Sequence, residues 1–233
     1  MRVLRSALFN LAFFGLTAGA AILALPLLLA PRGWTTWTMR QWARAVLWLL
    51  CRICGVRITV TGREHLPAQG PALIAAKHQS AFDTIVWFTL VPDAVYVIKH
   101  ELFRIPLYGW HARRAGMIGV DRGAGSQAMR GLLRGAKAAA AAGRQIVIFP
   151  EGTRVPPGER VPYQPGIVAL SAATGLPVIP VATNSGRVWG RRAFHKNPGE
   201  IIIAVLPPLP PRLGREALLG ELEARIEGAQ AGL

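Results

Sequence analysis

The chain from Val56 onward alternates short runs rich in β-branched residues with stretches of helical periodicity. Strands are predicted at 57–61, 71–76, 94–99, 117–120, 145–149, 177–182 and 201–206. Helices are predicted at 83–91, 126–142, 166–174 and 215–230. Such alternation is typical of an α/β domain. The sequence therefore predicts a mixed, partly parallel sheet flanked by helices, in a domain covering residues 56–233.

Residues 7–30 carry no charged side chain and are bracketed by Arg5 and Arg32. A helix of this length extends roughly 36 Å, against roughly 30 Å for the hydrocarbon layer of a bilayer. A cleaved signal peptide is the alternative, but its apolar region usually spans only about 7–15 residues. We expect the segment to enter a membrane, either as a full span or as a hairpin that turns near Pro26 and Gly33, because arginines at both ends set no orientation.

Residues 34–55 have helical periodicity with two distinct faces. Arginines occupy one face and apolar residues the other: Arg40, Arg44 and Arg52 against Trp42, Val46, Leu49 and Ile53. Four tryptophans lie in this segment, and their amphipathic rings suit the headgroup layer. We interpret it as an interfacial helix whose arginines face lipid phosphate, the alternative being a helix docked on the soluble domain. Residues 1–55 are thus predicted to form a two-helix membrane anchor.

Composition narrows the class of partner. The 233 residues are 52% hydrophobic and carry a net charge of +15, which excludes a disordered chain. A basic chain binds either nucleic acid or an anionic membrane surface. The scattered basic residues and the missing nucleic-acid motif favour the membrane and predict no nucleic-acid partner. Cys51 and Cys54 have no second ligand pair nearby, so apolar packing is expected rather than a metal site, in a reducing cytoplasmic setting.

The predicted strand at 71–76 leads directly into His78, and Asp83 follows five positions later. On one continuous helix these two side chains would lie about 140° apart, so they meet only if a turn separates them. A strand-to-helix corner provides that turn. Asp83 would then accept from one ring nitrogen of His78 and leave the other to take a proton. The alternative is that Asp83 only caps a helix whose N-cap is Ser80.

The strand predicted at 145–149 ends in the sequence Pro-Glu-Gly-Thr-Arg. Gly152 lets the backbone approach a ligand closely, and the Thr153 hydroxyl and Arg154 guanidinium suit a phosphate. The alternative is a surface turn with an ion pair between Glu151 and Arg154. Because ligands gather at the carboxyl ends of strands in such folds, two further cations at strand ends are weaker candidates for the same ligand: Lys99 and Arg122.

Together these stretches resemble the glycerolipid acyltransferase family typified by bacterial 1-acyl-glycerol-3-phosphate acyltransferase. The resemblance covers about residues 56–206 and rests on four motifs in the family's order: His78-x4-Asp83, Gly119-Val120-Asp121-Arg122, Phe149-Pro150-Glu151-Gly152-Thr153-Arg154 and Val178-Ile179-Pro180-Val181. One departure stands directly before His78, where this chain has Lys77 and asparagine is common in the family. We expect this change to alter local charge or substrate preference.

The resemblance implies a reaction and roles for these residues. His78 is expected to act as general base on the sn-2 hydroxyl of lysophosphatidate, with Asp83 fixing its tautomer. The acyl donor is expected to be acyl-CoA or acyl carrier protein, as co-substrate, with no cofactor and no metal. The residues expected to hold the glycerol phosphate are Glu151, Gly152, Thr153 and Arg154, with help from Arg122 and Lys99.

The resemblance also implies a location and leaves two alternatives. The protein is expected at the bacterial inner membrane, with its catalytic domain on the cytoplasmic side, in contact with lysophosphatidate and the anionic bilayer surface. One alternative is the same acyl transfer to another acceptor, such as a different lysophospholipid or a lyso-ornithine lipid. The other, a non-catalytic lipid-binding protein, is disfavoured because His78 and Asp83 are both present.

Overall fold

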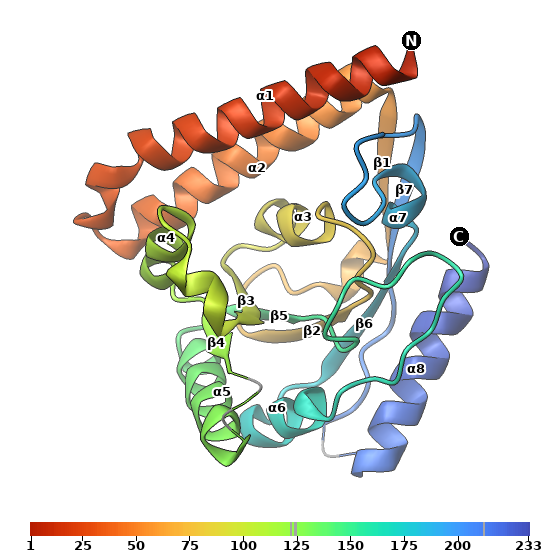
Figure 1. The fold of residues 1–233 in the computed structure, drawn as a ribbon. Coiled ribbons are helices and arrows are strands. Elements are labelled where there is room, and N and C mark those ends of the chain that lie inside the picture. Colours follow the sequence, from red (N-terminus) through yellow and green to blue (C-terminus); the bar gives the residue numbers. More distant parts are fainter. Residues whose placement is uncertain (122, 124, 212) are drawn as a thin grey trace.

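The structure is a computed structural model that describes residues 1–121, 123, 125–211 and 213–233. Two long N-terminal helices lie against a sheet that carries further helices on both faces (Figure 1). The helices are α1 (Arg2–Leu23), α2 (Arg32–Cys54), α3 (Asp83–Leu90), α4 (Tyr108–Arg114), α5 (Gly125–Ala141), α6 (Gly166–Thr174), α7 (Ser185–Val188) and α8 (Arg215–Ala231). The short 3₁₀ helices are η1 (Leu25–Leu28), η2 (Arg63–His65) and η3 (His100–Arg104).

The sheet has seven strands in the order β1-β7-β6-β2-β5-β3-β4. Their bounds are β1 (Val56–Thr61), β2 (Ala72–Ala76), β3 (Ala94–Lys99), β4 (Ile118–Val120), β5 (Gln145–Ile148), β6 (Val178–Thr183) and β7 (Gly199–Val205). All neighbouring pairs are parallel except β6 and β7, which run antiparallel. This confirms the predicted mixed, partly parallel sheet. It also brings the carboxyl ends of β6, β2 and β5 side by side at one edge, which is where ligands bind in such folds.

The central strand β2 contributes side chains to two apolar layers, one on each face of the sheet. Leu73 and Ala75 point to the layer under α5, α6 and α8, whereas Ile74 and Ala76 point to the layer under α2 and α3. All residues of β2 are buried, as expected for a parallel strand covered on both faces. The loops that follow this strand therefore start from a rigid, fully packed base.

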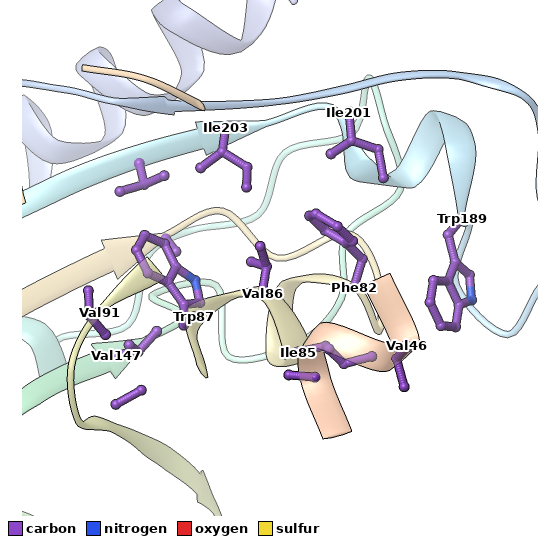
Figure 2. Packing of buried hydrophobic residues seen from close by; sticks show 14 of the residues in the cluster. Val46, Phe82, Ile85, Val86, Trp87, Val91, Val147, Trp189, Ile201 and Ile203 are labelled. Atoms are coloured by element: carbon purple, nitrogen blue, oxygen red, sulfur yellow. The ribbon is translucent and has the colours of Figure 1, made fainter. Parts of the chain in front are cut away.

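The layer under α3 is shown in Figure 2. Phe82 and Trp87 are almost fully buried there, and Ile201 and Ile203 of β7 belong to the same cluster. Burying one side chain of this size contributes about 1.5–3 kcal/mol to stability. Val46 of α2 lies in the same layer, so the second N-terminal helix shares a core with the α/β domain.

Helices α1 and α2 pack against each other as a hairpin (Figure 1). The turn runs through η1, which begins beside Pro26. Helix α1 touches the domain near both of its ends: Ser6 Oγ accepts a hydrogen bond from Lys196 N at 3.0 Å, and Ala21 O lies 2.9 Å from His111 Nε2. Among the described residues, α1 is the one helix that is long and apolar enough to cross a membrane by length and composition.

Helix α2 is docked on the domain, which was the alternative interpretation of this segment. Val46 and Leu50 are fully buried in the shared core. Arg40 donates to the carbonyl of Val91 at 3.2 Å and to that of Pro92, both at the carboxyl end of α3. The prediction that Arg40 faces lipid phosphate is therefore wrong, because its charge is used by carbonyl groups at a helix end.

The elements that the sequence did not predict are short and depend on tertiary contacts. Helix α4 has no apolar periodicity, and it begins after Leu107, which adopts a positive φ of 62°. Gly109 is needed inside it, because a Cβ there would stand 2.1 Å from the Phe103 carbonyl oxygen. The C-terminal residue of α4, Arg114, donates a hydrogen bond to the carbonyl of Ala30 at the hairpin turn, which holds this end of the helix in place. Helix α7 is a single turn after β6 and carries part of the candidate site.

Candidate active site

His78 and Asp83 meet at the turn between β2 and α3. His78 Nδ1 lies 3.1 Å from Asp83 Oδ2, and the two residues are 8% and 2% exposed. The contact is possible because β2 ends at Ala76 and α3 begins only at Asp83, so the chain reverses between the two side chains. Since Nδ1 is occupied, Nε2 is the ring nitrogen that is free to take a proton. It has no hydrogen-bond partner among the described residues.

The Asp83 carboxylate is held by the turn itself. Oδ2 accepts hydrogen bonds from the backbone N–H groups of Gln79 (2.7 Å) and Ser80 (2.8 Å). Ser80 is not the helix N-cap, because Phe82 holds that position and Ser80 Oγ accepts from Phe82 N at 3.1 Å just before the helix begins. A carboxylate with several charge-assisted bonds at a helix start is firmly oriented, so Asp83 serves the turn and the imidazole together.

Sequence reasoning missed a third partner of Asp83. Ser185, the first residue of α7, donates from Oγ to Asp83 Oδ1 at 2.6 Å. Gly186 N donates to Gln79 Oε1 at 3.0 Å, and a Cβ at Gly186 would stand 2.9 Å from Gln79 Cβ. The only signal for these contacts was the position of both residues directly after a strand that carries a proline-containing motif.

The imidazole of His78 is also fixed from its face. The ring of Phe149 stacks on it with centroids 4.0 Å apart and planes 17° apart, and Tyr96 stacks on Phe149 in turn. Aromatic stacking of this kind adds about 0.5–1.5 kcal/mol beyond burial. Phe149 therefore gives the ring one orientation, and the motif that it opens contacts the first motif directly.

The loop after β5 holds the main chain of His78 on both sides. Glu151 Oε2 accepts from His78 N at 2.6 Å, and Val155 N donates to His78 O at 2.8 Å. Glu151 is 4% exposed, and its Oε1 lies 2.9 Å from Lys77 Nζ. The prediction that Glu151 helps to hold the acceptor phosphate is corrected here, because its carboxylate is buried against a backbone N–H and a lysine.

Arg154 lies in the same electrostatic environment as the His–Asp pair. Burial lowers the pKa of its guanidinium, and the charge of Asp83 raises it, which places the two charges near each other. Gly152 adopts a positive φ of 68° and donates from N to Phe149 O at 2.9 Å, so it provides the reversal that turns the loop. Thr153 is exposed beside it. Phosphate binding by these three residues stays a prediction.

The two weaker cationic candidates have different outcomes. Lys99 ends β3 and its Nζ lies 2.9 Å from Glu101 Oε1, with the side chain 55% exposed. That charge is therefore already neutralised locally. Arg122 lies outside the described residues.

Two arginines that the sequence analysis did not select stand beside Arg154. Arg191 Nη1 donates to the carbonyl of Arg154 at 3.4 Å, and the charges of Arg191 and Arg192 both lower the pKa of the Arg154 guanidinium. Arg192 adopts a positive φ of 55°, which is uncommon for a residue with a Cβ. Adjacent arginines in an irregular segment were the only signal for this cluster.

The segment that carries these arginines is fastened to α1 by Lys196. This lysine is 3% exposed, and its Nζ donates to Asn10 Oδ1 at 2.7 Å, Ala193 O at 2.9 Å and Phe194 O at 3.1 Å. The ammonium also lies 5.0 Å from the ring centroid of Trp189. The first N-terminal helix therefore helps to position the arginines next to the site.

A family model described as Acyltransferase matches residues 57–184, which is more than half of the chain. The chain belongs to the acyltransferase family. The matched region of this acyltransferase contains His78, Asp83 and Arg154. It ends just before Ser185, so α7 and α8 lie beyond it.

The two curated relatives described next are both named 1-acyl-sn-glycerol-3-phosphate acyltransferase. The 1-acyl-sn-glycerol-3-phosphate acyltransferase of Pseudomonas aeruginosa is 32% identical over 189 residues, 81% of this chain and 73% of its own length. The alpha form from Mus musculus is 29% identical over 205 residues, 86% of this chain and 71% of its own. The crystal structure of the 1-acyl-sn-glycerophosphate acyltransferase of Thermotoga maritima matches with a TM-score of 0.81 at 21% identity, covering 100% of this chain and 97% of that one. The shared fold of this acyltransferase thus includes both N-terminal helices.

Proposed function

We propose that this acyltransferase moves a fatty acyl group from an acyl thioester to the sn-2 hydroxyl of 1-acyl-glycerol-3-phosphate, giving phosphatidic acid. The observation that carries the proposal is the buried contact between His78 Nδ1 and Asp83 Oδ2, with Arg154 close enough to interact with the same carboxylate. The names of the P. aeruginosa and mouse relatives support the choice of acceptor.

The geometry supports a direct transfer with His78 as general base. Nε2 takes the proton of the acceptor hydroxyl as its oxygen attacks the thioester carbonyl. The tetrahedral intermediate then expels the thiolate, which takes the proton back from the imidazolium and leaves as a thiol. Asp83 favours the imidazolium that forms between these steps, because its Oδ2 faces Nδ1. Neither Cys51 nor Cys54 takes part, since both lie in α2 and burial raises the pKa of each thiol.

The charge near Arg154 supports a phosphomonoester as the bound group. A phosphate monoester carries a charge of about −1.5 to −2 at pH 7, more than one guanidinium balances. Arg191 and Arg192 supply further positive charge beside Arg154, and Lys99 does not, because Glu101 pairs with it. We therefore assign the acceptor phosphate to Arg154, with Arg191 and Arg192 as its nearest additional cations.

The exposed apolar surface supports a location at a membrane. Helix α1 exposes a row of large apolar side chains on the side away from α2: Leu4, Leu8, Leu11, Phe14 and Ile22. Trp34 and Trp37 at the start of α2 are each 56% exposed. A helix that is apolar on its outer face and tied to a basic domain suits the bilayer interface. We propose that α1 lies in the cytoplasmic leaflet of a bacterial inner membrane, with the domain on the cytoplasmic side.

The donor is proposed to be acyl-CoA or acyl carrier protein. Both are water-borne and acidic, and a chain with a net charge of +15 attracts either of them. An assay with purified protein in lipid vesicles would offer each donor in turn with 1-acyl-glycerol-3-phosphate and measure release of the free thiol.

The acceptor is tested with a panel in the same assay. Lysophosphatidate, lysophosphatidylglycerol, lysophosphatidylethanolamine and a lyso-ornithine lipid would be compared at equal surface concentration. We expect kcat/KM to be highest for lysophosphatidate. A preference for another acceptor would replace the proposed substrate, and binding of all acceptors without thiol release would mean a lipid-binding protein instead. Complementation of a bacterium that lacks its own lysophosphatidate acyltransferase, by wild type and not by His78→Ala, gives the matching test in cells.

A further inference from the structure

Lys77, the residue directly before the general base, is a buried cation shared by two carboxylates. It is 1% exposed. Its Nζ lies 2.9 Å from Glu151 Oε1 and 2.6 Å from Glu227 Oε1. Tyr163 OH donates to the same Oε1 of Glu227 at 2.9 Å. Since Glu227 is on α8, the C-terminal helix reaches back to the residue that precedes His78.

Burial makes this cluster sensitive to each of its charges. Removing one partner of a buried ion pair is strongly destabilising, because the other charge is left uncompensated. The pKa of Glu151 is raised to about 7 by the balance of these effects: burial and the charge of Glu227 raise it, whereas the charge and hydrogen bond of Lys77 and the bond from His78 N lower it. Whether Glu151 is ionised near neutral pH therefore depends on Lys77 and Glu227 together.

The charge of Glu151 acts on the catalytic residue through the main chain. Glu151 Oε2 is the acceptor for His78 N at 2.6 Å, and an ionised acceptor makes roughly twice as strong a bond as a neutral one. The His78 carbonyl is held by Val155 N from the same loop. A change at Glu151 therefore alters how the imidazole is presented without touching Nδ1 or Nε2.

We propose that Lys77 and Glu227 are positioning residues of the acyl transfer, which hold the Glu151 carboxylate as the acceptor for the main-chain N–H of His78. This inference rests on the proposed role of His78 as general base. It assigns to α8, which lies outside the matched family region, a part in the reaction. It also explains the presence of Lys77 at a position where the family commonly has asparagine.

The groups that face Glu151 come from several segments. Lys77 and His78 follow β2, Glu227 is on α8, and Tyr163 lies in the loop before α6. Arg160 adds a second, largely exposed cation, with Nε 3.8 Å from Glu227 Oε2. Two of these groups have opposite effects on the Glu151 pKa: loss of Lys77 raises it, and loss of Glu227 lowers it.

The test compares the dependence of kcat on pH in two variants. If the acid limb of kcat follows the ionisation of Glu151, it should move to higher pH in Lys77→Asn, because loss of Lys77 raises the Glu151 pKa. It should move to lower pH in Glu227→Gln, because loss of Glu227 lowers that pKa. A displacement of one unit changes the rate about tenfold at a fixed pH on the limb. Glu221→Gln is the matched control on the same helix, because Glu221 is exposed and pairs only with Arg225 among the described residues; its limb should coincide with that of the wild type.

A double variant covers the case in which Lys77→Asn alone does not fold. Lys77→Asn/Glu227→Gln removes one charge of each sign, and its acid limb should lie between those of the single variants. Acid limbs that coincide in wild type and Glu227→Gln, or that move the same way in all folded variants, would overturn the inference.

A second measurement does not depend on turnover. The amide ¹⁵N–¹H resonance of His78 should titrate with Glu151, with midpoints displaced in the same opposite directions in the two variants. A His78 amide that does not titrate between pH 5 and 9 would refute the inference even if acyl transfer is normal. Normal amide titration in a protein that does not acylate lysophosphatidate would instead refute only the proposed substrate.

Discussion

Ser185 Oγ donates a 2.6 Å hydrogen bond to Asp83 Oδ1, although the two residues are 102 positions apart. The bond joins α7, at the end of β6, to the first residue of α3. The other carboxylate oxygen of Asp83 faces His78 and the backbone N–H groups of the turn, so the hydroxyl of Ser185 adds a further restraint on the direction of the carboxylate. The site is therefore built from two strand ends that are neighbours in the sheet and distant in sequence.

Ser185→Ala should lower kcat by about tenfold and leave KM for both substrates nearly unchanged, because a hydrogen bond to a charged group contributes about 1.5–3 kcal/mol. Steady-state kinetics would measure this. Ser171→Ala is the control, since Ser171 is also buried but lies in α6 and donates to the carbonyl of Leu176, just after that helix. An unchanged kcat in Ser185→Ala would mean that the turn alone orients Asp83.

His78→Ala should lower kcat by about 10²–10⁴, the usual contribution of a positioned base. Asp83→Asn should lower it as well, because the amide no longer stabilises the imidazolium. Circular dichroism and thermal melts would verify that both variants fold. Wild-type rates in a folded His78→Ala protein would contradict the mechanism.

Arg154→Gln should raise KM for lysophosphatidate by at least about tenfold, because a charge-assisted bond to the phosphate is lost. Arg191→Gln and Arg192→Gln should each give a smaller increase. Lysophosphatidylethanolamine, whose phosphodiester has less negative charge, should be affected less than lysophosphatidate. Arg63→Gln is the control, because it removes the same charge at the other end of the sheet, after β1. Equal effects of all four substitutions would point to general attraction by charge instead of a phosphate site.

Asp93→Asn should destabilise the protein and remove part of its sensitivity to acid. Arg32 contacts Asp93 through two hydrogen bonds, of 3.0 and 2.7 Å, and Arg144 through one of 3.1 Å. Burial raises the pKa of Asp93, but the two arginines outweigh it and hold the pKa below its ordinary value of 3.8. A depressed carboxyl pKa stabilises the fold above the unfolded value. That contribution is lost as pH falls below about 4.

Thermal melts between pH 3 and 7 would measure this effect. We expect Asp93→Asn to lower Tm by roughly 2–4 °C at pH 7, for a loss of about 1 kcal/mol, and to match the wild type more closely at pH 3. A difference in Tm that is the same at every pH would contradict the assignment to ionised Asp93.

Much of the fold was predictable because strands and long helices produce local patterns of apolar and β-branched residues in the sequence. The strand at 145–149 and the helix at 166–174 were predicted within a residue or so of their bounds, since β-branched runs and apolar periodicity are properties of the segment itself. Helix α4 was not predictable in the same way. Its seven residues are held by contacts with the hairpin turn, and such contacts leave no periodicity.

The site was predictable to the extent that its residues are close in sequence. His78 and Asp83 belong to one turn, so their spacing alone indicated a contact. Ser185 and Glu227 are brought in by the sheet order and by the packing of α8, which no local pattern contains. Glu151 was found but its role was not, because the sequence does not show that its carboxylate turns inward, toward Lys77.

The attachment of α1 to the segment around Lys196 has a practical consequence. Cutting away the first twenty-odd residues would remove Asn10, Phe9 and Phe13. This would leave the Lys196 ammonium short of an acceptor and expose the indole of Trp189, against which both phenylalanine rings pack. The segment that carries Arg191 and Arg192 would then no longer be held against α1. Truncation would thus damage the enzyme in solution, and the hairpin is better treated as a structural part of the enzyme than as a removable segment.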